Sequence, residues 1–171
     1  MASAETIDLG RLALRPGDGR RVELDLVVEG IELAGQDYSL VPNPVAARLD
    51  ISRTASGHAI RLTFSGTVAG PCMRCLGPAE VEVDVEAREV DQRGAEDEEL
   101  RSPYVEDEVL DVGALAHDAL ALALPQQLLC RPDCAGLCPV CGESLNDAEP
   151  GAHDHPSEPD PRFAKLRELL D

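Results

Sequence analysis

Cysteine and histidine residues in this sequence occur at spacings typical of a metal or thiol site. Two Cys-x-x-Cys pairs are present, in "PCMRC" and "CPVCG", and two further cysteines precede the second pair in "CRPDC". A histidine pair, "HDH", begins twelve residues after the last cysteine. The candidate residues are Cys72, Cys75, Cys130, Cys134, Cys138, Cys141, His153 and His155. Such residues support a disulfide framework, a redox pair, a catalytic zinc centre or a structural zinc site.

The expected compartment argues against disulfides. The opening "MASAETIDLG" lacks the basic and apolar regions of a secretory signal. No segment reaches the roughly 18 apolar residues of a membrane span. We therefore expect a cytoplasmic protein without a membrane segment, whose cysteines are kept reduced. A thioredoxin-like redox pair opens a helix in a βαβ unit, whereas Cys72 and Cys75 lie between two predicted strands.

A catalytic zinc centre lacks its general base. "PCMRC" matches half of the zinc deaminase signature, which also requires His-x-Glu upstream. The nearby upstream histidine is His58, and Ile60 stands where the glutamate is needed. No serine-nucleophile, phosphate-binding or metalloprotease motif is present either, so we predict that the protein is not an enzyme. His58 is instead expected at the surface or rim of a strand, and His117 on the solvent side of a helix.

Structural zinc fits the residue types best, because such sites take four tetrahedral ligands from thiolate and imidazole groups. Eight candidates divide into two sites of four, and the natural division keeps each close pair together. The first site then consists of Cys72, Cys75, Cys130 and Cys134. The second consists of Cys138, Cys141, His153 and His155. In a rival division the four clustered cysteines of residues 130–141 bind one ion, and the other four candidates bind none.

Alternating apolar and polar residues predict four half-buried strands in the first half of the chain. Their apolar positions begin at Val22, Val45, Ile60 and Val81. Turns rich in glycine and proline separate several of these stretches. "GPCMRCLGP" lies between the last two strands, so Cys72 and Cys75 are expected at the tip of a hairpin. Residues 1–90 thus predict an antiparallel β-sheet or small barrel.

The second half of the chain predicts helices around the zinc-binding segment. Residues 91–110 form an acidic, poorly patterned connection that we expect to be largely mobile. "DVGALAHDALALALP" predicts a central helix with Asp111 as its cap. Its expected buried face carries Leu115, Ala119 and Leu122. Residues 111–171 then contain this helix, the cysteine- and histidine-rich segment and a short C-terminal helix in "RFAKLRELL". The expected fold class is α+β.

Charge and composition limit the partners. The net charge of −18 disfavours general affinity for nucleic acid. Residues 82–111 carry thirteen acids and three bases, a net of −10, whereas residues 1–75 carry nine and eight. Aromatic residues make up only 2% of the chain, which argues against base stacking on single-stranded RNA. Candidate contacts with RNA or a partner are Arg11, Arg15, Arg20, Arg21, Arg162, Lys165 and Arg167.

Several motifs resemble those of one family, the YceD or large ribosomal RNA subunit accumulation proteins. They are "PCMRCL", "LALPQQLLCRPDCAGLCPVCGESLN" and "DPRFAKLRELL", and "LGRLALRPG" is similar to the family's opening. Many members carry Cys-x-Cys after the Leu-Asn of the second motif, where this chain has His153 and His155. Exchange of thiolate for imidazole preserves zinc binding. The departure therefore favours a metal role over a disulfide.

The resemblance implies a non-catalytic role in building the large ribosomal subunit, through accumulation of 23S ribosomal RNA. Two modes of action follow from the charges. The basic side chains would contact precursor 23S RNA or a large-subunit assembly particle directly. Alternatively, the acidic segments would make the protein an adaptor or chaperone for a basic ribosomal protein. A zinc-ribbon adaptor in transcription is a third reading, for which the sequence offers only the cysteine pairs.

Overall fold

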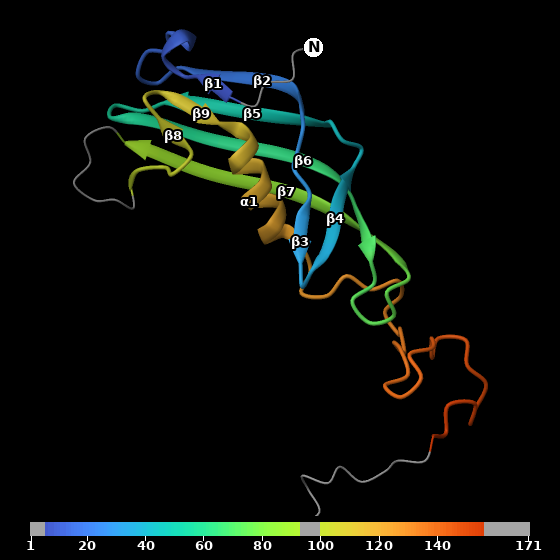
Figure 1. The fold of residues 1–171 in the computed structure, drawn as a ribbon. Helices are drawn as coiled ribbons and strands as arrows, with labels where there is room; N and C mark the ends of the chain where they lie inside the picture. Colours follow the sequence, from blue (N-terminus) through green and yellow to red (C-terminus); the bar gives the residue numbers. More distant parts are fainter. Residues whose placement is uncertain (1–5, 93–99, 156–171) are drawn as a thin grey trace, which may run out of the picture.

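The computed structural model describes residues 6–92 and 100–155, which are built mainly of antiparallel strands (Figure 1). The elements are β1 (Thr6–Asp8), the 3-10 helix η1 (Gly10–Leu12), β2 (Gly19–Leu26), β3 (Ile31–Leu33), β4 (Gln36–Val41), β5 (Val45–Arg53), β6 (Gly57–Pro71), β7 (Pro78–Gln92), β8 (Val105–Glu106), β9 (Val109–Asp111) and α1 (Val112–Ala123). No helix within the described ranges is long and apolar enough to cross a bilayer.

The long strand β6 organises the main sheet. Along one edge it pairs with β7 over its whole length, from Gly57 opposite Gln92 to Pro71 opposite Pro78. Along its other edge it pairs first with β5 and then with β4. β2 pairs with β5 and β3 pairs with β4, so both outer strands lie on the side of β6 opposite to β7. The result is one antiparallel sheet, and the turn between β6 and β7 lies at one end of it (Figure 1).

Strict alternation puts one row of apolar side chains on the inner face of this sheet. Leu49, Leu62 and Ala87 are cross-strand neighbours, and Leu49 and Leu62 are completely buried. Helix α1 packs against β7 and belongs to the same hydrophobic core. Its buried stripe follows the i, i+3, i+4 spacing of an amphipathic helix: Val112, Leu115, Ala116, Ala119 and Leu120.

A small sheet, with strand order β1-β9-β8, leads directly into this helix. Asp111 ends β9 and caps α1, because its side chain accepts a hydrogen bond from the backbone N–H of Ala114 at 2.8 Å. Tyr104 donates its hydroxyl to Asp118 Oδ2 at 2.9 Å and so connects the preceding segment to the helix. Burial and this carboxylate raise the pKa of Tyr104 to about 12.

The expected α+β fold class is wrong: the described residues form two antiparallel sheets with a single α-helix. The four predicted strands correspond to β2, β5, β6 and β7, and the predicted central helix to α1. Sequence patterning missed the five short strands, because runs of two to six residues give too little alternation to recognise. The predicted C-terminal helix lies outside the described residues.

Three smaller expectations also differ from the structure. The expected acidic connection contains β8 and most of β9. Leu122, expected on the buried face of α1, is 88% exposed, because it lies at the margin of the buried stripe in the last turn. His58, expected at a surface or rim, is only 2% exposed, and its Nε2 lies 3.1 Å from Arg53 Nη1. Strand alternation places it on the same face of β6 as the buried residues Ile60 and Leu62, so it is buried with them.

Candidate metal centres

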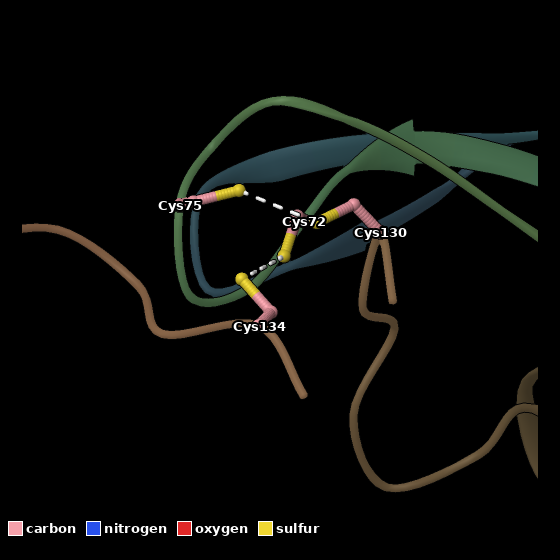
Figure 2. Close-up of side chains that lie close together, drawn as sticks. All are labelled: Cys72, Cys75, Cys130 and Cys134. Carbon is pink, nitrogen blue, oxygen red and sulfur yellow. Dashed lines mark hydrogen bonds between the residues drawn. The ribbon is translucent and has the colours of Figure 1, made fainter. Parts of the chain in front are cut away.

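The turn between β6 and β7 positions the first two cysteines. The backbone N–H of Cys72 donates to Gly77 O at 2.7 Å, and that of Leu76 donates to Cys72 O at 2.9 Å. Leu76 has a φ of 59°, in the left-handed region that tight turns require. The turn therefore brings Cys72 and Cys75 together at the end of the hairpin, as the sequence predicts (Figure 2).

The chain after helix α1 supplies the other two cysteines. The backbone N–H of Met73 donates to Leu128 O at 2.9 Å, and the Leu128 side chain is buried in the core. This attachment brings Cys130 and Cys134 to the hairpin tip (Figure 2). We call the set Cys72, Cys75, Cys130 and Cys134 the four-cysteine centre; its Sγ atoms all lie within 4.8 Å of one another.

The sulfur geometry of the four-cysteine centre fits a tetrahedral ion better than disulfides. All six cysteines are free. The Sγ atoms of Cys72 and Cys134 lie 3.7 Å apart, and those of Cys75 and Cys130 lie 3.6 Å apart. A tetrahedron with zinc–sulfur bonds of about 2.3 Å has edges of about 3.8 Å, whereas a disulfide bond is only about 2.05 Å long. The donor set and its spacing therefore match a closed thiolate site for a metal ion.

The electrostatics of the four-cysteine centre favour a cation. Burial raises the pKa of the Cys72 thiol, but hydrogen bonds from the backbones of Cys75, Arg74 and Cys130 outweigh it and lower the pKa to about 6. Desolvation and the neighbouring thiols raise the pKa of Cys130 to about 12. Burial also opposes ionisation of Cys134, but hydrogen bonds from Asn146 and from the backbone of Gly136 lower its pKa. Thiolates therefore form readily at Cys72 and Cys134, and these repel further thiolates. A bound divalent cation removes that repulsion and makes the deprotonated forms stable together.

A second group consists of Cys138, Cys141, His153 and His155, whose ligand atoms also lie within 4.8 Å of one another; we call it the cysteine–histidine centre. The backbone N–H of Gly142 donates to Cys138 O at 2.8 Å and closes the turn. Hydrogen bonds from the backbone N–H groups of Cys141 and Val140 help to lower the pKa of Cys138 to about 7.

Both histidines of this centre present a ring nitrogen to the cluster. His153 Nδ1 lies 3.3 Å from Cys141 Sγ. His155 Nε2 is buried and has no hydrogen-bond partner among the described residues. An imidazole nitrogen in that position is suited to coordinate an ion. Both groups of four can hold a metal ion, and they divide the eight residues so that each Cys-x-x-Cys pair stays in one group.

A model of the family described as "Large ribosomal RNA subunit accumulation protein YceD" matches residues 60–170 of this chain. The matched residues include both centres. The chain belongs to the YceD family. An uncharacterized protein of Mycobacterium tuberculosis is 37% identical to this YceD chain over 182 aligned residues, which cover 99% of this chain and 83% of that relative. An uncharacterized protein of Mycobacterium leprae is 29% identical over 179 residues, covering 99% and 79%. No solved structure matches the chain.

Four of the basic residues singled out in the sequence lie exposed in the described part of this YceD protein, and two of them form surface ion pairs. Arg21 forms an ion pair with Asp50 at 2.7 Å, and Arg11 forms one with Asp8 at 3.1 Å. Arg15 and Arg20 are exposed near the start of β2. The other three candidates, Arg162, Lys165 and Arg167, lie outside the described residues.

Sequence reasoning missed two polar residues at the four-cysteine centre. Arg74 donates from Nη1 to Cys134 O at 3.1 Å and from Nη2 to Gln127 Oε1 at 3.3 Å. Its guanidinium therefore connects the turn between β6 and β7 to the segment that carries Cys134. Asn146 donates from Nδ2 to Cys134 Sγ at 3.5 Å. The only signal for Asn146 in the sequence was its place in "GESLN", directly after the second Cys-x-x-Cys pair.

Separate replacement of each close cysteine pair tests the division into two centres. With Cys138→Ser and Cys141→Ser together, the purified protein is expected to retain one equivalent of metal, in the four-cysteine centre. With Cys72→Ser and Cys75→Ser together, it is expected to retain one equivalent in the cysteine–histidine centre. Elemental analysis after purification in excess zinc gives the stoichiometry. Loss of both equivalents in either variant would contradict the division.

Proposed function

We propose that this protein is a non-catalytic assembly factor that supports accumulation of 23S ribosomal RNA during biogenesis of the large ribosomal subunit. The observation that carries the proposal is the family match over residues 60–170, which includes every candidate metal ligand. The family's description supplies the link to large-subunit RNA. The sequence supplies no recognised set of acid, base and nucleophile, which supports a role without catalysis.

We further propose that both centres hold Zn²⁺ in a structural role. Four thiolates, or two thiolates with two imidazoles, are donor sets that zinc accepts in tetrahedral geometry. The four-cysteine centre joins a hairpin tip to a segment 55 or more positions later, so its ion would fix the C-terminal segment on the sheet. We place the protein's work in the cytoplasm, where ribosomes assemble and thiols stay reduced.

A charged sheet face favours an acidic adaptor for a basic ribosomal protein as the second candidate. Strand β7 exposes a row of acids at every second residue: Glu80, Glu82, Asp84 and Glu86. The same face has an open hollow of about 570 Å³. Its charged lining residues are Glu23, Asp25, Asp84, Glu86, Arg48 and Arg61. Four acids and two bases give this hollow a net charge of −2, which suits the basic side chains of a ribosomal protein better than RNA phosphate.

Deletion of the gene tests the main proposal. In a cell without a second copy, loss of the protein is expected to lower the amount of 23S RNA relative to 16S RNA. Quantification of both RNAs from growing cells gives the ratio, and the gene supplied on a plasmid is expected to restore it. An unchanged ratio in the deletion strain would refute the ribosomal function.

Treatment with ribonuclease separates direct RNA binding from protein binding. The acidic face is the row of Glu80, Glu82, Asp84 and Glu86 on β7. If this face captures a ribosomal protein, that protein should remain bound to the tagged chain after large-subunit precursor particles are treated with ribonuclease. Reversal of Glu82 and Asp84 to lysine should then weaken the capture, whereas Glu32→Lys on β3 serves as a matched exposed control. Loss of all partners with the nuclease would favour direct contact with RNA.

A further inference from the structure

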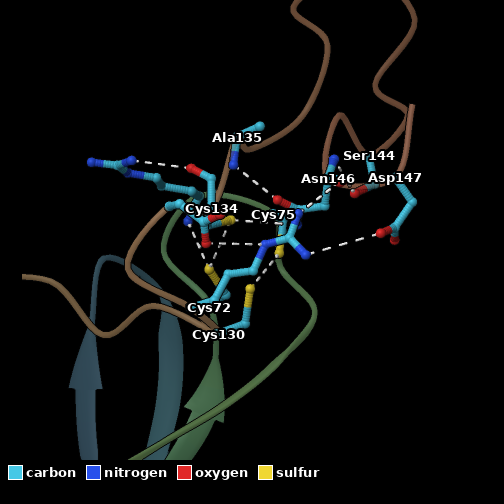
Figure 3. Close-up of polar contacts among 11 residues, drawn as sticks. Cys72, Cys75, Cys130, Cys134, Ala135, Ser144, Asn146 and Asp147 are labelled. Atoms are coloured by element: carbon cyan, nitrogen blue, oxygen red, sulfur yellow. Dashed lines mark hydrogen bonds and ion pairs between the residues drawn. The ribbon is translucent and has the colours of Figure 1, made fainter. Parts of the chain in front are cut away.

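Asn146 belongs to the loop of one centre but contacts the other. It lies between Cys141 and His153, which are both members of the cysteine–histidine centre. Its side chain lies at the four-cysteine centre, where Oδ1 accepts the backbone N–H of Ala135 at 2.8 Å (Figure 3). Nδ2 then points to Cys134 and donates to its Sγ at 3.5 Å. The contact with Ala135 therefore fixes which end of the amide faces the sulfur.

Further hydrogen bonds hold the same loop on the segment between the two centres. The carbonyl oxygen of Asn146 accepts from Arg131 Nη2 at 2.6 Å. The backbone N–H of Leu145 donates to Gly136 O at 2.9 Å, and Ser144 forms an isolated antiparallel bridge with Leu137. Only three residues, 135–137, separate Cys134 from Cys138. The position of the loop on Cys134 therefore depends on the turn that carries the second pair of cysteines.

The charge of a filled four-cysteine centre explains why this contact matters. Four thiolates around one Zn²⁺ leave a net charge of −2, in a chain whose net charge is already −18. N–H donors to the sulfurs reduce the cost of that charge. Cys72 has a donor within its own turn, the backbone N–H of Arg74 at 3.4 Å. The side-chain donor to Cys134 comes from the loop of the other centre.

We infer that Asn146 couples the two metal centres, so that an ion in the cysteine–histidine centre strengthens metal binding at the four-cysteine centre. An ion held by Cys141 and His153 fixes both ends of the loop and keeps the amide on Cys134. Because coupling between binding sites is reciprocal, an ion in the four-cysteine centre also strengthens binding at the cysteine–histidine centre. Asn146 is a positioning residue here, since its amide donates to a ligand and does not bind the ion. The inference rests on the metal assignment proposed above.

Cobalt titration of the reduced, metal-free full-length chain tests the coupling. Co²⁺ bound by four sulfurs and Co²⁺ bound by two sulfurs and two nitrogens absorb differently in the visible range, so each centre reports its own occupancy. In the native chain both spectra should rise together. In Asn146→Ala the affinity of the four-cysteine centre should fall by about 10- to 100-fold, the usual effect of losing a partner that supports a metal ligand. Glu149→Gln, at an exposed position of the same loop, should keep the native affinity.

Two further variants separate coupling from a general loosening of the loop. Asn146→Asp retains an acceptor for Ala135 but replaces the donor to Cys134 with a negative charge. It should bind Co²⁺ at the four-cysteine centre at least as weakly as Asn146→Ala. The double variant Cys138→Ser with Cys141→Ser should show a similar loss at that centre. Addition of Asn146→Ala to the double variant should produce little further loss, because the loop no longer holds the amide in place.

Each of the opposite results has a definite meaning. An affinity of the four-cysteine centre within about twofold of the native value in Asn146→Ala, or full rescue by Asn146→Asp, overturns the coupling. Losses that multiply in the triple variant overturn it as well. In these cases the two metal sites themselves remain supported by their spectra. A native chain that shows no thiolate–cobalt absorption overturns the metal assignment, and the coupling with it.

Discussion

Cys72→Ser together with Cys134→Ser should release residues 130–146 from the hairpin tip while the main sheet stays folded. These two residues are the most buried members of the four-cysteine centre, with exposures of 0% and 2%. Structural zinc contributes apparent binding energies of about 10–16 kcal/mol in small modules, which is enough to decide whether a segment folds. The sheet keeps its own apolar core, and Leu26, Leu49 and Leu62 of that core are fully buried without any metal ligand nearby in sequence.

Hydrogen exchange combined with elemental analysis measures this outcome. Residues 130–146 should lose protection and one metal equivalent should disappear, whereas strands β5 and β6 should remain protected. Met73→Ser is the matched control, because Met73 lies in the same turn, is 37% exposed and is not among the candidate ligands. Unchanged protection of residues 130–146 in the double variant would show that the ion does not hold this segment.

Replacement of Leu62 by alanine should destabilise the whole sheet by about 2–5 kcal/mol. Leu62 is fully buried near the middle of β6, and its cross-strand neighbours are Leu49 on one side and Ala87 on the other. Truncation leaves a cavity that the flanking strands cannot close, because each of them is paired along its length with β6. A loss of that size is a large part of the stability of a typical domain.

Urea unfolding of the zinc-loaded protein measures the effect on the free energy of unfolding. Leu122→Ala is the control with the same chemical change, and its 88% exposure predicts an effect within about 0.5 kcal/mol. Zinc release from the four-cysteine centre should follow sheet unfolding, because that unfolding separates Cys72 and Cys75 from Cys130 and Cys134. Equal destabilisation by the two alanine variants would contradict the placement of Leu62 in the core.

The parts of the fold that the sequence predicts are those with long periodic patterns. β6 and β7 each run for fifteen residues, and their alternation also placed Cys72 and Cys75 at a hairpin tip. The helix was recognisable from Asp111 and the apolar spacing that follows it. Alternation does not reveal which edges pair. The arrangement of β4 and β5 along one edge of β6, and the small sheet of β1, β9 and β8, therefore appeared only in three dimensions.

The candidate ligands were predictable because zinc imposes short spacings on cysteine and histidine. Residue types and spacing cannot show which pairs meet in space, and two divisions of the eight candidates were therefore compatible with the sequence. The structure brings Cys75 within reach of Cys130, 55 positions later in the chain. Asn146 was not predictable as a partner of Cys134, since asparagines in loops are common and its contact depends on the folding of residues 135–145.

The long separation between the two halves of the four-cysteine centre has a consequence for protein synthesis. Cys75 emerges from the ribosome 55 residues before Cys130. At about 5–20 residues per second, the first pair therefore waits roughly 3–11 seconds for its partners. During that interval it is a reduced dithiol on an incomplete chain, open to oxidants and to competing thiophilic metals. The speed of translation thus sets the length of the period in which this protein is vulnerable to oxidative and metal stress.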